Sequence, residues 1–145
     1  MKVNVNWIGG VAFVGETASG HRILMDGPPE NGSRNLGPRP METFLLGMGA
    51  CSCVDVVLIL QKARQNIQDC RIEISASRAE TDPKVFTEIH LNFILVGNDL
   101  QDKQVERAIK LSAEKYCSAS IMLGKTAKIT HSHIINPPAE SKGQP

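Results

Sequence analysis

The chain has 145 residues, the length of one domain that buries a core without help from metals or structural disulfides. Its 16 basic and 15 acidic residues give a formal net charge of +1, which provides no electrostatic argument for nucleic acid or an anionic membrane surface as a partner. We expect a single domain over residues 1–136, followed by a flexible polar tail over residues 137–145.

The N-terminal segment alternates between apolar and polar side chains. Val3, Val5 and Trp7 share one face, and residues 11–17 and 21–26 repeat this period of two around a Ser-Gly turn. The pattern predicts a three-stranded antiparallel meander. The first residues lack the apolar segment of a secretory signal, so the predicted location is the cytoplasm.

A loop and a long helix are predicted next. Residues 27–39 are rich in turn-forming residues and have no apolar periodicity, which indicates a loop. Pro40 suits the first turn of a helix, Glu42 complements the positive end of its dipole, and the apolar pattern continues to about Asn66.

The apolar part of this helix, residues 43–60, has the length of a membrane span. Asp55 interrupts it, and a carboxylate at mid-bilayer costs roughly 2.5 to 3.5 kcal/mol. We therefore expect a buried helix of a soluble protein, with no membrane as partner. Because residues 54–60 are apolar nearly all round apart from Asp55, one small domain can hardly cover the helix, which favours a second subunit.

The second half of the chain predicts a strand hairpin, a helix and a last strand. Alternation over residues 70–77 and 86–96 indicates two strands joined by a turn through Asp82-Pro83. A capped, amphipathic helix should stop near Tyr116, and residues 128–135 alternate again. The predicted fold class is α+β with antiparallel pairing.

Two cysteine motifs carry a resemblance to a known family. Residues 40–51 read Pro-Met-Glu-Thr-Phe-Leu-Leu-Gly-Met-Gly-Ala-Cys, and the second motif is Lys-Tyr-Cys-Ser around Cys117. Both, in this order, resemble the OsmC/Ohr family of osmotically inducible and organic-hydroperoxide-resistance proteins, in an OsmC-like branch with G-A-C-x-x-V-D-V-V at the first cysteine. The resemblance implies an antiparallel sheet with a long buried central helix, and an intertwined homodimer with its active sites at the subunit interface.

The resemblance also implies a thiol cycle. Cys51 would attack an organic hydroperoxide and become a sulfenic acid, Cys117 would condense with it to a disulfide, and an external dithiol of lipoyl type would reduce the bridge. No cofactor is needed, and the sequence has no dinucleotide fingerprint or haem attachment motif.

The residues alone leave other interpretations of the cysteines open. Free cysteine is often a buried core residue, so Cys51 would be taken as inert without the family motif. Cys53 lies roughly 200° further round the same helix, so it cannot bridge to Cys51 while the helix is intact. We interpret Cys53 and Cys70 as packing residues. The spacing of the four cysteines predicts no metal site.

The sequence departs from the family pattern at the groups that activate the thiol. Met41 and Val11 stand where the family has a glutamate and an arginine, and Glu42 and Arg39 are the first substitutes; a plain surface arginine is the alternative for Arg39. Asp55, one turn after Cys51, opposes a thiolate unless it is paired. With Asp55 unpaired we expect Cys51 to titrate at or above about 8.

Two further sets of side chains have competing interpretations. Phe44 and Met48, with Leu45 and Phe93, are candidates for a pocket that selects bulky hydroperoxides, or are ordinary core. His131 and His133 share one face of the last strand, where they suit a metal only if a third ligand joins them; a partly exposed strand face is the simpler interpretation.

Three functions remain in competition at this level. The leading one is a thiol-dependent organic hydroperoxide reductase. The second is a non-catalytic protein with the same fold that binds a lipid or another small molecule, and the third is a redox sensor in which a Cys51–Cys117 bridge alters the dimer.

Overall fold

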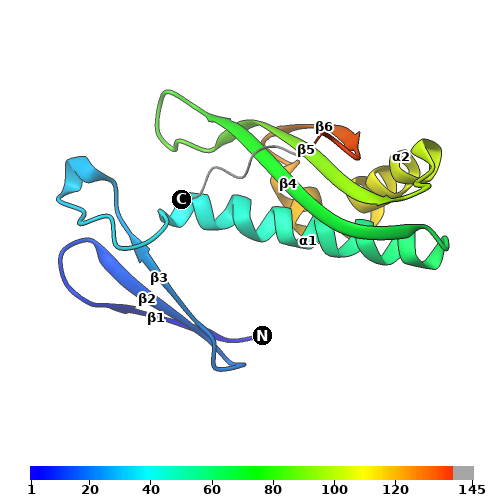
Figure 1. Ribbon diagram of the computed structural model, residues 1–145. Helices are drawn as coiled ribbons and strands as arrows, with labels where there is room; N and C mark the ends of the chain where they lie inside the picture. The colour runs from blue at the N-terminus through cyan, green and yellow to red at the C-terminus, as the bar shows by residue number, and fades with distance from the viewer. Residues whose placement is uncertain (139–145) are drawn as a thin grey trace. The chain divides into compact units, whose positions relative to one another are not determined.

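The computed structural model describes residues 1–138. The chain forms two compact units, Met1–Leu46 and a second unit that begins at Gly47. Most of the tail expected at residues 137–145 lies outside the described residues. Each unit carries its own three-stranded sheet (Figure 1).

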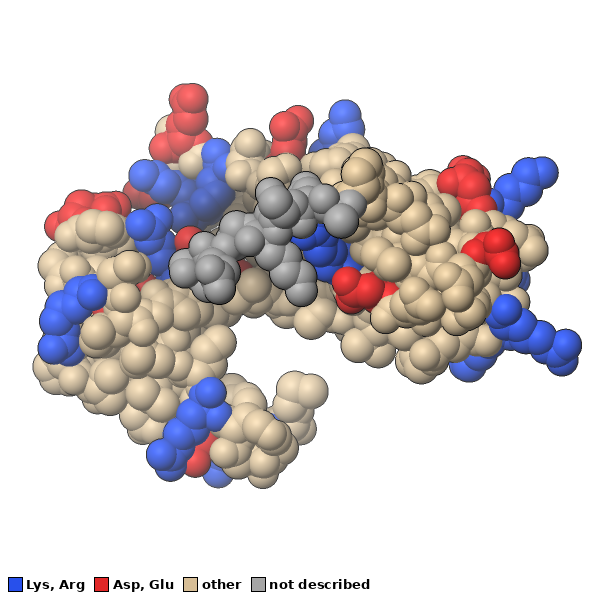
Figure 2. Space-filling view, viewed as in Figure 1, with Lys and Arg blue, Asp and Glu red and all other residues tan. Residues whose placement is uncertain are grey.

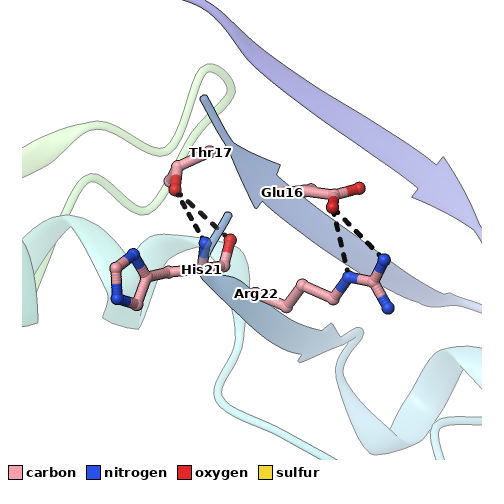
Figure 3. A network of polar contacts seen from close by, with 4 residues as sticks. All are labelled: Glu16, Thr17, His21 and Arg22. Atoms are coloured by element: carbon pink, nitrogen blue, oxygen red, sulfur yellow. Dashed lines mark hydrogen bonds and ion pairs between the residues drawn. The ribbon is translucent and has the colours of Figure 1, made fainter. Parts of the chain in front are cut away.

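The N-terminal unit is an antiparallel meander of β1 (Val3–Trp7), β2 (Ala12–Thr17) and β3 (Arg22–Asp26), which confirms the predicted order and pairing. Figure 3 shows the polar contacts at one end of β2 and β3. Arg22 donates to Glu16 at 3.2–3.3 Å, and the hydroxyl of Thr17 bonds to both backbone groups of His21. These contacts fix the register next to the turn.

Asp26, at the end of β3, organises the loop that follows. Its side chain is almost fully buried and accepts backbone N–H groups from Gly27 at 2.9 Å and from Arg34 and Leu36 at 3.1 Å. The loop at residues 27–39 was expected, and it includes a short 3-10 turn, η1 (Pro29–Asn31). The Asp26 carboxylate therefore fixes the conformation of a loop that contains no strand and no long helix.

Helix α1 (Pro40–Lys62) begins as predicted and is capped by its own sequence. Glu42 Oε2 accepts the backbone N–H of Arg39 at 2.8 Å, which satisfies a donor that the helix leaves free. The prediction that the helix runs to about Asn66 was wrong, because Arg64 adopts a left-handed φ of 57° and β4 starts at Asn66.

The second sheet consists of β4 (Asn66–Arg78), β5 (Phe86–Asn98) and β6 (Lys128–Ile135). β4 and β5 form the expected antiparallel hairpin. β6 instead pairs parallel to β5, with His131 opposite Leu91, so the prediction of purely antiparallel pairing was wrong. The reason is the connection: helices lie between β5 and β6 in the chain, and a helical crossover returns a strand in parallel.

The crossover contains α2 (Asp102–Leu111), a π-helical turn η2 (Ser112–Tyr116) and α3 (Ser118–Leu123). The sequence predicted one helix that stops near Tyr116. In the structure the α-helix ends at Leu111, and the last turn before Cys117 is the wider π-helical turn. The apolar segment expected after Cys117 is a third, short helix.

The core of the second unit lies between the helices and one face of this sheet. Leu91, Phe93 and Leu95 of β5 are fully buried, as are Val56 and Leu60 of α1.

Close packing of α1 on β4 depends on Gly49. A Cβ atom at this position would stand 2.9 Å from Ile74 Cδ1 and 3.1 Å from Ile72 Cγ2. The absence of a side chain therefore lets the helix approach the strand.

Helix α1 is only partly covered within one chain, although the resemblance implied a buried central helix. Its buried residues are Met48, Gly49, Ser52, Val56 and Leu60. Phe44, Leu46, Val54 and Leu58 remain 48–60 % exposed. Large apolar side chains of this kind on one helix are typical of a surface that binds another protein chain.

By length and hydropathy, α1 also passes as a membrane-spanning helix, with a mean hydropathy of 2.1 over its most apolar window. Two polar residues in that window, Ser52 and Asp55, make hydrogen bonds to Cys117 and Ser112 of the crossover. These contacts attach one side of α1 to the crossover, and 28 % of the apolar window is buried within the chain.

On one face of the molecule, charged side chains of both signs are interspersed (Figure 2). On the face shown in Figure 2, lysine and arginine side chains alternate with aspartate and glutamate over the described residues. A mixed surface of this kind gives no preference for a polyanion.

Candidate active site

The structure brings Cys51 and Cys117 together with Asp55. The two sulfur atoms and a carboxylate oxygen lie within 4.8 Å of one another. Cys51 and Asp55 come from successive turns of α1, and Cys117 stands at the junction of η2 and α3. Cys117 is fully buried, whereas Cys51 is half-buried and so is the more accessible thiol.

The π-helical turn positions Cys117. Its backbone N–H reaches back to the Ser112 carbonyl at 2.8 Å and closes the wide turn, after which the backbone is extended at Cys117 itself. The sulfur then accepts the backbone N–H of Ser120 at 3.4 Å, in the way a side chain caps a helix. The chain is thus bent so that one cysteine is both helix cap and site residue.

Two serines complete the surroundings of this sulfur. Ser52 Oγ donates to Cys117 Sγ at 3.3 Å, and the Ser52 and Ser120 hydroxyls lie 3.4 Å apart. Both serines are buried. Sequence reasoning missed them; the signals available were a serine next to Cys51 on an apolar helix, and the Ser-Ala-Ser run after Cys117.

The environment stabilises a thiolate on Cys117. Burial alone opposes the charge, but hydrogen bonds from Ser120, Ser52 and Cys51 outweigh it and lower the pKa of Cys117. The pKa of Cys51 is raised, first by burial and then by its hydrogen bond to Cys117, with the charges of Cys117 and Asp55 acting in the same direction. As the pH rises, the pair of thiols therefore loses its first proton from Cys117, and Cys51 remains protonated.

Asp55 is held by Ser112, whose hydroxyl donates to Oδ2 at 3.1 Å. This bond gives Asp55 a partner, but the partner is a neutral hydroxyl that leaves the charge of the carboxylate in place. Asp55 also lines a cavity of about 380 Å³, whose other lining residues are Leu58, Ile59, Lys62, Ala63, Arg107, Leu111 and Tyr116. The cavity is thus largely apolar, with two cationic side chains and one carboxylate.

The other candidate site residues have different surroundings. The Glu42 carboxylate caps α1 through the backbone of Arg39. Met48 is fully buried and Phe44 is 56 % exposed. Neither lines the cavity beside Asp55. The activating role of Arg39 and Glu42 and the pocket role of Phe44 and Met48 stay predictions.

Cys51, Asp55 and Cys117 form the one group of three potential metal ligands found in the described part of the chain. A structural zinc site has four protein ligands, so this set is one ligand short.

The two histidines of the last strand are engaged elsewhere. His133 Nε2 pairs with Asp102 Oδ1 at 2.8 Å. His131 stacks on Phe93 with 6.3 Å between ring centroids, and burial lowers its pKa, with the charge of His90 adding to the effect. This arrangement is that of a strand face packed against helices.

Comparison with known proteins gives the same fold and family. The model of the OsmC-like protein family matches residues 31–132. Protein YhfA of Escherichia coli strain K12 is 50 % identical over 135 residues, which cover 93 % of this chain and 98 % of that protein. A crystal structure of a protein from Aquifex aeolicus shares 32 % identity, with a TM-score of 0.78 over 94 % of this chain and 97 % of that one.

A more distant structure is the organic hydroperoxide resistance protein OhrB of Bacillus subtilis, at 18 % identity and a TM-score of 0.63, covering 92 % of this chain and 96 % of that one. At this identity the likeness concerns the fold. The assignment of the sequence to a family rests on the family model and on the relative from Escherichia coli. The chain belongs to the OsmC-like protein family.

Proposed function

We propose that the protein reduces organic hydroperoxides to alcohols through Cys51 and Cys117, as part of defence against oxidative stress. The observation that carries this proposal is the contact between an accessible thiol, Cys51, and a buried thiol whose anion is stabilised by three hydrogen-bond donors. Thiol-based peroxide reduction needs one sulfur that attacks and a second that captures the oxidised form. The name of the OhrB relative points to the same substrate class.

The first step assigns different roles to the two sulfurs. Cys51 is the one a peroxide can reach, but it holds its proton, while the Cys117 thiolate accepts a hydrogen bond from it. As the Cys51 sulfur attacks the terminal peroxide oxygen, its proton passes to Cys117 and the O–O bond breaks. The alkoxide takes up a proton and leaves as an alcohol, and Cys51 becomes a sulfenic acid.

The second step closes the disulfide. The Cys117 sulfur attacks the Cys51 sulfur, the S–O bond breaks, and hydroxide leaves as water with the remaining proton. One hydroperoxide and two thiols thus give one alcohol, one water and one disulfide. An external dithiol of lipoyl type then reduces the bridge by thiol–disulfide exchange, without a bound cofactor.

The cavity beside Asp55 is the proposed route for substrate. Leu58, Ile59, Leu111 and Tyr116 provide an apolar wall next to the carboxylate that borders the two thiols. Such a wall favours a bulky alkyl hydroperoxide over hydrogen peroxide, because the alkyl group gains from burial. We further propose that the protein acts in the cytoplasm as a homodimer, in which the exposed apolar residues of α1 are covered.

Steady-state turnover tests this function. The assay follows consumption of cumene hydroperoxide with dihydrolipoamide as the reductant, for the wild type and for Cys51→Ser, Cys117→Ser and Cys53→Ser. We expect turnover in the wild type and in Cys53→Ser, and a loss of most of this turnover in the other two. Equal turnover in all four proteins would show that Cys51 and Cys117 are not the reacting pair.

A binding protein without turnover is the second candidate, and one observation favours it. The charged groups that act on the pKa of Cys51 are Cys117 and the Asp55 carboxylate, both of which oppose a thiolate, and no cation is among them in the described residues. In that case the apolar cavity with Lys62 and Arg107 would hold an amphiphilic anion. Extraction of a copurified lipid from inactive protein would support this function. A redox sensor would form the disulfide but turn over slowly.

A further inference from the structure

A second pair of cysteines lies between α1 and β4. Cys53 and Cys70 are both half-buried, and each thiol affects the pKa of the other. The backbone around them supports a contact between the two thiols: one turn earlier on α1, Gly49 packs directly against Ile72 and Ile74 of β4. The thiols therefore meet where helix and strand already approach closely.

The two cysteine pairs lie on different sides of the same helix. Cys51 meets the junction of η2 and α3, whereas Cys53 meets β4. Two positions along an α-helix correspond to roughly 200° of rotation, so Cys51 and Cys53 cannot exchange partners while the helix is intact. Chemistry at one pair is thus independent of the other.

The second pair is also asymmetric. The hydrogen bond from Cys70 lowers the pKa of Cys53, although burial opposes this, while the same bond and burial raise the pKa of Cys70. Of the two thiols, Cys53 is accordingly the one that loses its proton more easily. An attacking thiolate next to a protonated thiol is the arrangement that disulfide formation requires.

We propose that Cys53 and Cys70 form a second redox-active dithiol, oxidised by hydroperoxides to a disulfide that ties α1 to β4. The Cys53 thiolate attacks the peroxide, the O–O bond breaks, and the alkoxide leaves as an alcohol after taking up a proton. Cys70 then attacks the Cys53 sulfenic acid, and the oxygen leaves as water with the proton of the Cys70 thiol. Neither step uses Cys51 or Cys117, and the proposal therefore stands or fails separately from the function proposed above.

The bridge would restrain the helix that carries Cys51. Closing the short segment between α1 and β4 removes conformations from the unfolded chain, which corresponds to a rise in Tm of about 5–10 °C for a domain of this size. Oxidation of the second pair would therefore stabilise the unit that contains the first one.

The test uses the double variant Cys51→Ser, Cys117→Ser, in which only the second pair remains. After treatment with cumene hydroperoxide and blocking of free thiols, trypsin should release residues 35–62 linked to residues 65–71, because Arg39 precedes a proline and is not cleaved. We expect this linked peptide, loss of both titratable thiols, reversal by dithiothreitol, and the rise in Tm. Free, alkylated Cys53 and Cys70 after treatment would overturn the proposal.

Matched variants separate the two sulfurs and guard against a misfolded double variant. With Cys70→Ser added, Cys53 should accumulate as a sulfenic acid that dimedone traps, whereas with Cys53→Ser added, Cys70 should stay a free thiol. The wild type gives an internal check, since residues 35–62 should be linked both to 65–71 and to 116–125. Wild-type peptides linked only to 116–125 would contradict a second redox pair.

Discussion

The hydroxyl of Ser52 donates a 3.3 Å hydrogen bond to the sulfur of Cys117, which joins the central helix to the turn before α3. Both residues are buried, so water cannot replace this donor. Because a hydrogen bond to a charged acceptor is worth about 1.5–3 kcal/mol, a single neutral side chain has a large effect on which sulfur carries the charge.

Replacing Ser52 by alanine should therefore weaken the proposed reductase activity. Loss of the donor raises the pKa of Cys117, so less thiolate is present to accept the Cys51 proton, and turnover at neutral pH should fall about 10-fold or more. Ultraviolet titration of thiolate absorbance measures the first effect and the peroxide assay the second. Ser118→Ala, at an exposed neighbouring serine, is the control and should behave as the wild type.

Asp55→Asn should have the opposite effect on Cys51. The carboxylate contributes to the raised pKa of Cys51, and asparagine keeps an acceptor for Ser112 while removing the charge. The pKa of Cys51 should fall, so the attacking sulfur gives up its proton more easily, and turnover near neutral pH in the pH–rate profile should increase about 3-fold or more. The exposed Glu106→Gln tests for a general effect of charge. An unchanged profile in Asp55→Asn would show that the carboxylate does not influence the thiols.

The serines around Cys117 illustrate the limit of prediction from sequence. Strand alternation and the proline at the start of α1 depend on neighbouring residues, so the meander, the hairpin and the long helix were predicted. Ser52, Ser112 and Ser120 act through contacts with segments far away in the chain, and a serine within a helix gives no local signal of such a partner. The parallel pairing of β6 was missed for the same reason, since it follows from the path of the crossover.

The thiol roles show a second limit. The motif around Cys51 indicated by resemblance a candidate for the attacking cysteine, and the structure brings its expected partner beside it. The direction of the pKa shifts depends on burial and on three donors around Cys117, which only the folded chain provides.

Gly49 should be sensitive to substitution, and Gly47 provides a matched control on the same helix. A methyl group at Gly49 would meet Ile72 and Ile74 at 3.1 and 2.9 Å, whereas a Cβ at Gly47 meets nothing within 4 Å. Gly49→Ala should lower the free energy of unfolding by about 1–3 kcal/mol, while Gly47→Ala should raise it by up to about 1 kcal/mol through helix propensity. Urea denaturation measures both, and equal effects would contradict the close packing of α1 on β4.

Asp26 should make the N-terminal unit sensitive to acid. The backbone N–H of Leu36 is the largest influence that lowers the pKa of Asp26 in the folded state, and burial opposes it. A depressed pKa stabilises the fold above the ordinary carboxyl value and loses this effect as the pH falls through the folded-state pKa. Asp26→Asn should increase amide hydrogen exchange at Gly27, Arg34 and Leu36 at pH 7. It should also weaken the dependence of stability on pH below about 4.

A charge on the exposed face of α1 should dissociate the proposed homodimer. Val54 is 57 % exposed in the single chain, so Val54→Lys costs little within one subunit but would place an unpaired charge in an apolar interface. Light scattering after gel filtration should give a dimer for the wild type and a monomer for the variant. A monomeric wild type would refute the proposed dimer.

The central claim is that Cys51 and Cys117 are a redox pair, and peptide mapping tests it most directly. Reduced wild-type protein receives one equivalent of cumene hydroperoxide, free thiols are blocked, and tryptic peptides are analysed by mass spectrometry without reductant. We predict residues 35–62 linked to residues 116–125 within seconds, together with the corresponding alcohol. Residues 116–125 recovered with Cys117 alkylated, and unconsumed peroxide, would contradict the account.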